Sequence, residues 1–112
     1  MNKRQQGYIY EKMVEDYLKE ESYEILDKNY TIRGGEIDII VRKDNVVCFV
    51  EVKWTKYDMD FQDYITEKKK KALIKTAKDW KMKNEEDSIE EYRFDLALVV
   101  NEDIDYIENF LF

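Results

Sequence analysis

Apolar side chains recur near the start of the chain at intervals of three and four residues, the spacing of one face of an α-helix. This first stripe consists of Tyr10, Met13, Val14, Tyr17 and Leu18. It predicts a helix over residues 7–21. A second stripe consists of Leu73, Ile74, Ala77 and Trp80. It predicts a helix that begins at Asp63 or Thr66 and ends near residue 83.

Between and after these helices, the apolar positions alternate or form short runs bounded by turn-forming residues, which is typical of β-strands. We expect strands over residues 23–30, 36–43, 46–53, 92–100 and 104–110. The expected order is therefore α-β-β-β-α-β-β. This order favours a mixed sheet flanked by helices in an α/β fold, and residues 1–112 are short enough to form a single domain.

The register of the expected hairpin over residues 36–53 depends on its turn, because an odd loop with a bulge would shift every pair by one residue. If Asp44 and Asn45 form a two-residue turn, Asp38 lies opposite Glu51 and Glu36 lies opposite Lys53. These four residues then share one face of the sheet, because strand side chains alternate. The opposite face would carry Ile37, Ile39, Val41, Cys48, Val50 and Val52.

Two carboxylates directly across a strand pair repel each other and destabilise the sheet. In one interpretation, Lys53 and Arg33 neutralise the pair at a solvated strand end. In the other, a hard divalent cation such as Mg²⁺ or Mn²⁺ binds the carboxylates together with the main-chain carbonyl of Val52. Lys53 would then orient water or a phosphate oxygen, an arrangement suited to phosphodiester hydrolysis.

The composition restricts the chemistry further. The 112 residues carry a net charge of −7, no histidine and one cysteine. Histidine-based hydrolysis, imidazole-bound zinc and an intrachain disulfide are therefore excluded. The side chains that remain available for catalysis are carboxylates, lysine and tyrosine. The single Cys48 is expected in the core, and a cytoplasmic location is the expectation.

The charge is unevenly distributed along the chain. Residues 66–83 contain eight lysines and two acidic residues, so this segment carries +6. Such a helix could contact phosphates, although exposed lysines also simply solvate a helix face. Lys69 and Lys70 fall near the apolar stripe, so each either extends along it or points toward the acidic pair.

The segments over residues 35–40, Gly-Glu-Ile-Asp-Ile-Ile, and 49–53, Phe-Val-Glu-Val-Lys, resemble the YraN family of small bacterial proteins. The resemblance spans nearly the whole chain. It includes residues 7–11, the Asn29-Tyr30 pair, Lys69 with the apolar positions after it, and residues 93–95. The family has a restriction-endonuclease-like fold related to archaeal Holliday junction resolvases, so the resemblance implies this fold here.

The resemblance also implies site roles. Asp38 and Glu51 would be the metal-binding acids, Lys53 the catalytic lysine, and Glu11 a further acid that acts directly or through water, with Mg²⁺ or Mn²⁺ as cofactor. Thr55 stands where the family usually has arginine, which removes one phosphate contact. The implied activity is a metal-dependent nuclease acting on DNA, including branched or single-stranded DNA.

Other roles remain open at this point. Lys56, Lys69 and Lys70 are candidate nucleic-acid contacts, and five tyrosines could stack on bases: Tyr8, Tyr10, Tyr17, Tyr57 and Tyr64. The alternatives to a nuclease are a non-catalytic nucleic-acid-binding protein and a protein-interaction module of the same fold. No membrane partner is expected, and the related resolvases make a homodimer conceivable.

Two further acids are interpreted as structural. Asp95 lies within an apolar strand, and we expect it to pair with Arg93 or Arg33. Glu36 is expected to form a salt bridge within the hairpin.

Overall fold

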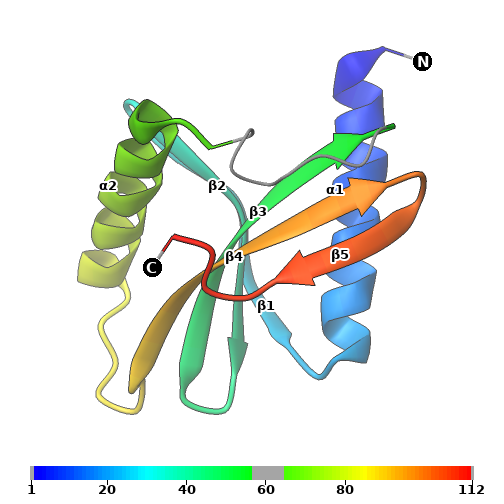
Figure 1. Cartoon of the computed structure of the whole chain (residues 1–112). Helices are drawn as coiled ribbons and strands as arrows, with labels where there is room; N and C mark the ends of the chain where they lie inside the picture. Colours follow the sequence, from blue (N-terminus) through cyan, green and yellow to red (C-terminus); the bar gives the residue numbers. More distant parts are fainter. Residues whose placement is uncertain (1, 57–64, 112) are drawn as a thin grey trace.

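The computed structural model describes residues 2–56 and 65–111. Its elements follow the expected order (Figure 1): α1 (Lys3–Glu20), β1 (Glu24–Ile32), β2 (Gly35–Lys43), β3 (Val46–Thr55), α2 (Glu67–Lys83), β4 (Glu91–Val100) and β5 (Asp103–Ile107). The α/β fold with a five-stranded mixed sheet and two flanking helices is therefore confirmed, and it is consistent with a restriction-endonuclease-like fold. The candidate base-stacking residues Tyr57 and Tyr64 lie outside the described residues.

Both helices begin at residues whose side chains cap the first turn. Asn2 accepts a hydrogen bond from the Gln5 main chain, and the Gln5 side chain accepts one from the Asn2 main chain, which forms a capping box. This box starts α1 four residues before the expected position. Thr66 caps α2 by accepting from the Lys69 N–H, so of the two expected starting residues Thr66 is the correct one.

The sheet has the order β1-β2-β3-β4-β5. Strands β3 and β4 pair in parallel, and the other three pairs are antiparallel. Helix α2 lies in the chain between the two parallel strands, as a parallel connection requires. In Figure 1, α1 and α2 lie on opposite sides of the sheet.

Each face of the sheet has its own apolar cluster. On the α1 side, Val14 and Leu18 pack against seven buried residues of β2, β3 and β4: Ile39, Val41, Cys48, Val50, Val52, Ala97 and Val99. On the α2 side, Leu73, Ala77 and Trp80 pack with Ile37, Ile40, Val47, Phe49, Phe94 and Leu111. Cys48 is buried, as expected.

The hairpin of β2 and β3 has the predicted register over its length from the turn. Lys43 pairs with Val46 and Ile39 with Val50, and Asp44 adopts the positive φ of 55° that the two-residue turn needs. The ladder ends at Ile39 and Val50, so the direct pairings of Asp38 with Glu51 and of Glu36 with Lys53 are not formed as ladder pairs.

The end of this ladder explains one wrong expectation. Ile37 was predicted on the same face as Ile39, but Ile37 belongs to the α2-side cluster and Ile39 to the α1-side cluster. The strict alternation of the strand therefore breaks at Asp38. There the Asp38 carboxylate, and not a main-chain carbonyl, accepts the N–H of Val52 at 2.8 Å. The side chains on the two sides of Asp38 therefore do not follow the regular alternation between the two faces of the sheet.

Gly35 sets the distance between β2 and α2. A Cβ at this position would lie 2.0 Å from Oγ1 of Thr76 and 2.9 Å from the carbonyl oxygen of Ala72. Any side chain would thus overlap the helix main chain. The glycine brings α2 close enough to carry its lysines toward the end of the hairpin.

Asp95 holds the last strand and the following turn to the sheet. Its fully buried carboxylate accepts hydrogen bonds from Arg93, from the Tyr106 hydroxyl at 2.6 Å and from the Asn109 N–H at 2.9 Å. Arg93 also donates to the Tyr23 hydroxyl. The expected pairing of Asp95 with Arg93 is confirmed, and the buried charge is fully compensated.

Neither α1 nor α2 is both long and apolar enough to cross a bilayer.

Candidate active site at the end of the β2–β3 hairpin

The structure brings Asp38 and Glu51 together where β2 and β3 separate. Asp38 comes from β2 and Glu51 from β3. The Asp38 carboxylate is held by the Val52 N–H, the main-chain group directly after Glu51. Burial, and after it the charge of the neighbouring Glu51, raises the pKa of Asp38. The sequence predicted this proximity, although it arises beside the ladder and not within it.

Glu51 is buried but incompletely satisfied. Only 4% of its surface is exposed, and its Oε2 has no hydrogen-bond partner among the described residues. Its other oxygen, Oε1, lies 3.2 Å from Nζ of Lys69 and 3.8 Å from Nζ of Lys53. One carboxylate oxygen thus faces two lysines, while the second is a buried acceptor without a donor, an arrangement that costs free energy.

The electrostatic state of the pair follows from this burial. Burial, followed by the neighbouring charge of Glu51, raises the pKa of Asp38 to about 8, although the Val52 N–H stabilises the ionised form. Burial also raises the pKa of Glu51, against the opposing effects of Lys69 and Lys53. In the absence of a cation, the pair therefore holds a proton near neutral pH.

Glu11 lies on α1 beside this pair. Its Oε1 accepts a hydrogen bond from Nδ2 of Asn29 at 2.8 Å, and the same amide group donates to Glu36 at 3.3 Å. Both carboxylates raise the pKa of Asp38. Glu36 was expected to pair with Lys53, but the Lys53 ammonium instead lies beside Glu51, and Glu36 accepts its hydrogen bond from Asn29.

The residues present fit a hard divalent cation. Within residues 2–56 and 65–111, no three acidic or thiol side chains gather closely enough to form a ligand set by themselves. The direct protein ligands would therefore be the carboxylates of Asp38 and Glu51 with the carbonyl of Val52, which are oxygen donors that suit Mg²⁺ or Mn²⁺. The unpartnered Oε2 of Glu51 is the group that such a cation would satisfy.

The predicted nucleic-acid contacts separate into different positions. Lys69 points into the site, as its ion pair with Glu51 shows. Lys70 is half-buried on α2, and Lys56 is exposed just after β3. Among the described tyrosines, Tyr8 is 64% exposed, whereas Tyr10 stacks on Trp54 and Tyr17 packs against Tyr106.

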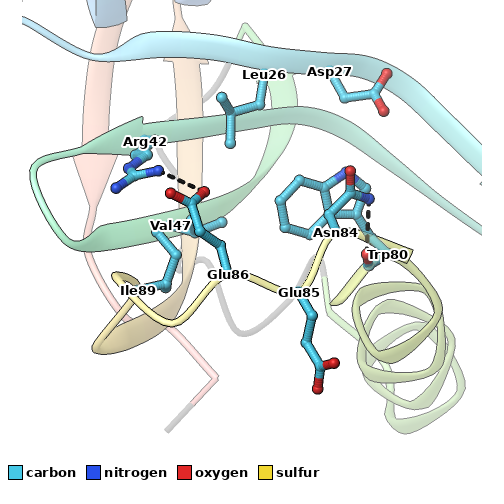
Figure 2. Close-up of a pocket in the computed structure, with 9 residues that line it drawn as sticks. All are labelled: Leu26, Asp27, Arg42, Val47, Trp80, Asn84, Glu85, Glu86 and Ile89. Carbon is cyan, nitrogen blue, oxygen red and sulfur yellow. Dashed lines mark hydrogen bonds and ion pairs between the residues drawn. The ribbon is translucent and has the colours of Figure 1, made fainter. Parts of the chain in front are cut away.

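A separate pocket lies away from the carboxylates, between β1, β2 and the segment that follows α2 (Figure 2). It has a volume of about 360 Å³, and Trp80 lines its inner wall. Three of its polar groups have partners: Arg42 pairs with Glu86 at 2.9 Å, and the Asn84 amide donates to the carbonyl of Trp80. The first contact joins the segment after α2 to β2, and the second closes the end of α2.

Two residues near the site were not identified from the sequence as functional candidates. Asn29 orients Glu11 and Glu36 from β1. Trp54 follows the Glu51-Val52-Lys53 segment and remains 38% exposed, which is unusual for a side chain of this size. In the sequence, the signal that could have identified it is a tryptophan placed directly after the Glu51-Val52-Lys53 segment.

Comparison with known proteins places the chain in a family. A sequence model described as "Uncharacterised protein family UPF0102" matches residues 10–99. A UPF0102 protein of Vibrio parahaemolyticus is 37% identical over 112 residues, covering 96% of this chain and 93% of the relative. One from Lachnoclostridium phytofermentans is 37% identical over 97% of this chain and 94% of its own length, and one from Campylobacter jejuni is 35% identical over 86% and 84%. The chain therefore belongs to the UPF0102 family, which is the YraN family.

Proposed function

We propose that the protein is a metal-dependent nuclease that hydrolyses DNA phosphodiester bonds. The observation that carries this proposal is the pair of Asp38 and Glu51, with the unpartnered Oε2 of Glu51 buried beside a carboxyl group whose pKa is raised to about 8. A buried acidic pair of this kind costs stability, and a bound cation would remove that cost.

Asp38, Glu51 and the carbonyl of Val52 would hold Mg²⁺ or Mn²⁺. The cation would supply Lewis-acid polarisation of a phosphoryl oxygen and of water. Glu11 lies near enough to influence Asp38 electrostatically, and we assign it a role through water.

Lys53 and Lys69 are the cations that the chain itself contributes. The Lys53 side chain is 31% exposed, so its ammonium can reach a phosphate oxygen or a water molecule while it remains next to Glu51. Lys69 compensates the charge of Glu51 from α2. The buried Glu51 carboxylate lies in a medium poorer in water than the surface, where these charges act more strongly.

The second candidate function is a nucleic-acid-binding protein without turnover. One observation favours it: the ammonium of Lys69 lies 3.2 Å from Glu51 and itself compensates the charge of that carboxylate. In that case the lysines of α2 would contact phosphates, and the acidic pair would be a structural ion cluster.

Cleavage assays distinguish the two candidates. Plasmid, duplex, branched and single-stranded DNA are incubated with Mg²⁺ or Mn²⁺ and the parent protein, Asp38→Asn, Glu51→Gln or Lys53→Ala. We expect cleavage by the parent and its loss, by at least about 100-fold, in each variant. Glu24→Gln is the matched control, because it removes an exposed carboxylate at the start of β1, opposite Arg42, and should retain most activity.

The variants also report on contaminating enzymes. Equal cleavage by the parent and Asp38→Asn would assign the activity to a contaminant or to another site. DNA binding without cleavage in either metal would favour the second candidate.

A further inference from the structure

A hollow of about 460 Å³ opens beside the candidate site, between the start of α1 and the ends of β1 to β3. Six of the residues that line it matter here: Lys3, Arg4, Tyr8, Glu11, Glu36 and Trp54. Glu11 and Glu36 are the two carboxylates that act on Asp38. The hollow therefore adjoins the acidic pair and is lined by groups different from those that contact Glu51.

The indole of Trp54 forms a flat surface in this hollow and is supported from behind by α1. Trp54 stacks on Tyr10 of α1, with ring centroids 5.5 Å apart and planes inclined by 28°. Gly7 lies against the indole, since a Cβ at this position would be in ordinary van der Waals contact with the ring at 3.4 Å. The indole is thus supported by α1, yet 38% of the residue is exposed, and Tyr8 nearby is 64% exposed.

Side chains of both charges line the hollow. Lys3 and Arg4 on the first turn of α1 supply positive charge, whereas Glu11 and Glu36 supply acceptors that Asn29 holds in place. An aromatic platform combined with cations is the arrangement by which proteins bind a single nucleic-acid strand: the base stacks and the phosphates meet the cations. The carboxylates can accept from the amino and imino groups of a base.

We propose that this hollow binds one unpaired nucleobase, stacked on Trp54, of a strand whose backbone runs past Lys3 and Arg4 toward the acidic pair. Both faces of a base inside a duplex are covered by its neighbours, so only a base in a single strand, at an end or at a junction can occupy the platform. This inference gives the substrate class of the proposed nuclease and rests on that function for the direction of the strand, while the binding of the base is measurable by itself.

Binding is measured by fluorescence anisotropy in EDTA, where cleavage cannot contribute, with a labelled short oligothymidylate and a duplex of the same length. We expect the parent to bind the single strand more tightly. Trp54→Phe, the matched control, keeps an aromatic face and should bind nearly as the parent does. Trp54→Leu keeps apolar volume over Tyr10 without an aromatic face, and should bind the single strand about 5- to 150-fold more weakly, with little change for the duplex.

A fluorescence measurement keeps the test decisive if Trp54→Leu folds poorly. The chain has two tryptophans, and Trp80 is buried in the α2-side cluster. In Trp80→Phe, excited at a wavelength that tyrosine does not absorb, the emission comes from Trp54, and a base stacked on it should quench this emission as oligothymidylate is added. Unchanged emission, or equal single-strand binding by the parent and Trp54→Leu, overturns the proposal.

The outcome is independent of the nuclease assay. Asp38→Asn should bind oligothymidylate in EDTA at least as tightly as the parent. If Trp54 governs binding but no protein cleaves, the stacking site stands and the nuclease proposal fails. If cleavage depends on Asp38 but binding ignores Trp54, the reverse holds.

Discussion

Replacing Asp38 by asparagine should make the stability of the protein less sensitive to alkaline pH. The folded protein holds a proton on Asp38 up to a pKa of about 8, whereas the unfolded chain releases it near the ordinary value of 3.8. Between these values the unfolded state binds fewer protons. Stability from this group is therefore complete below about pH 3.8 and is lost as the pH rises through 8.

The magnitude follows from the difference between the two pKa values. At about 1.4 kcal/mol per tenfold change in proton concentration, the full difference corresponds to an upper limit of about 6 kcal/mol, of which about 4 kcal/mol falls between pH 5 and pH 8. Asp38 is half-buried and coupled to Glu51. We therefore expect about 2 kcal/mol in practice.

Asparagine cannot ionise, but its side-chain oxygen can still accept the Val52 N–H. The free energy of unfolding, measured in urea with EDTA from pH 5 to pH 8.5, should fall more steeply for the parent than for Asp38→Asn. Asp103→Asn, which removes an exposed carboxylate at the start of β5, reports the effect of losing a solvated acid. If the difference between the parent and Asp38→Asn is the same at all pH values, the site does not hold the proton and the described electrostatics are wrong.

Three further predictions concern the metal, the basic helix and the packing of α2. Mn²⁺ should stabilise the parent by about 2.7 kcal/mol at 100 times its dissociation constant; thermal melts should show most of this gain in Lys53→Ala and little in Asp38→Asn, and equal gains in all three would place the ion elsewhere. Replacing the exposed Lys68 and Lys71 by alanine should reduce the salt dependence of duplex binding by up to about 0.9 log units per lost phosphate contact; an unchanged slope would make them ordinary solvated lysines. Gly35→Ala should lower stability by about 1–3 kcal/mol in urea unfolding, because the new methyl group meets Thr76 at 2.0 Å; a wild-type midpoint would contradict the close approach of α2.

Most of the fold could be predicted from the sequence because local patterns determine it. The apolar stripes located both helices, and the Asp44-Asn45 turn fixed the register of the β2–β3 ladder. The start of α1 was placed too late, since the capping box of Asn2 and Gln5 uses polar residues that precede the apolar stripe. Helix boundaries set by caps are harder to predict than those set by burial.

The sequence predicted that Asp38 and Glu51 lie close together, but it did not predict which other side chains contact them. Strand alternation brought Asp38 and Glu51 to one place, yet it assigned Ile37 to the wrong face, because the Asp38 side chain substitutes for a ladder partner of Val52. Lys69 approaches Glu51 because Gly35 lets α2 pack closely on β2. The spacing of apolar residues along the sequence does not reveal such a contact between distant segments. Asn29 was missed for the same reason: its bond to Glu11 joins β1 to a helix.

The acidic pair also has a consequence for the order in which the protein folds. The β2–β3 hairpin is closed by a two-residue turn, whereas the parallel pairing of β3 with β4 joins distant segments, as the partners Val50 and Asp95 show. Local pairs form sooner than distant ones, so the two carboxylates should meet before Lys69 arrives on α2. In the folding transition state their repulsion would then lack its compensating charge. Refolding should therefore slow in alkaline solution, where the pair loses the proton that it holds near neutral pH. The same feature that prepares the site for a cation would then also slow the closure of the hairpin around it.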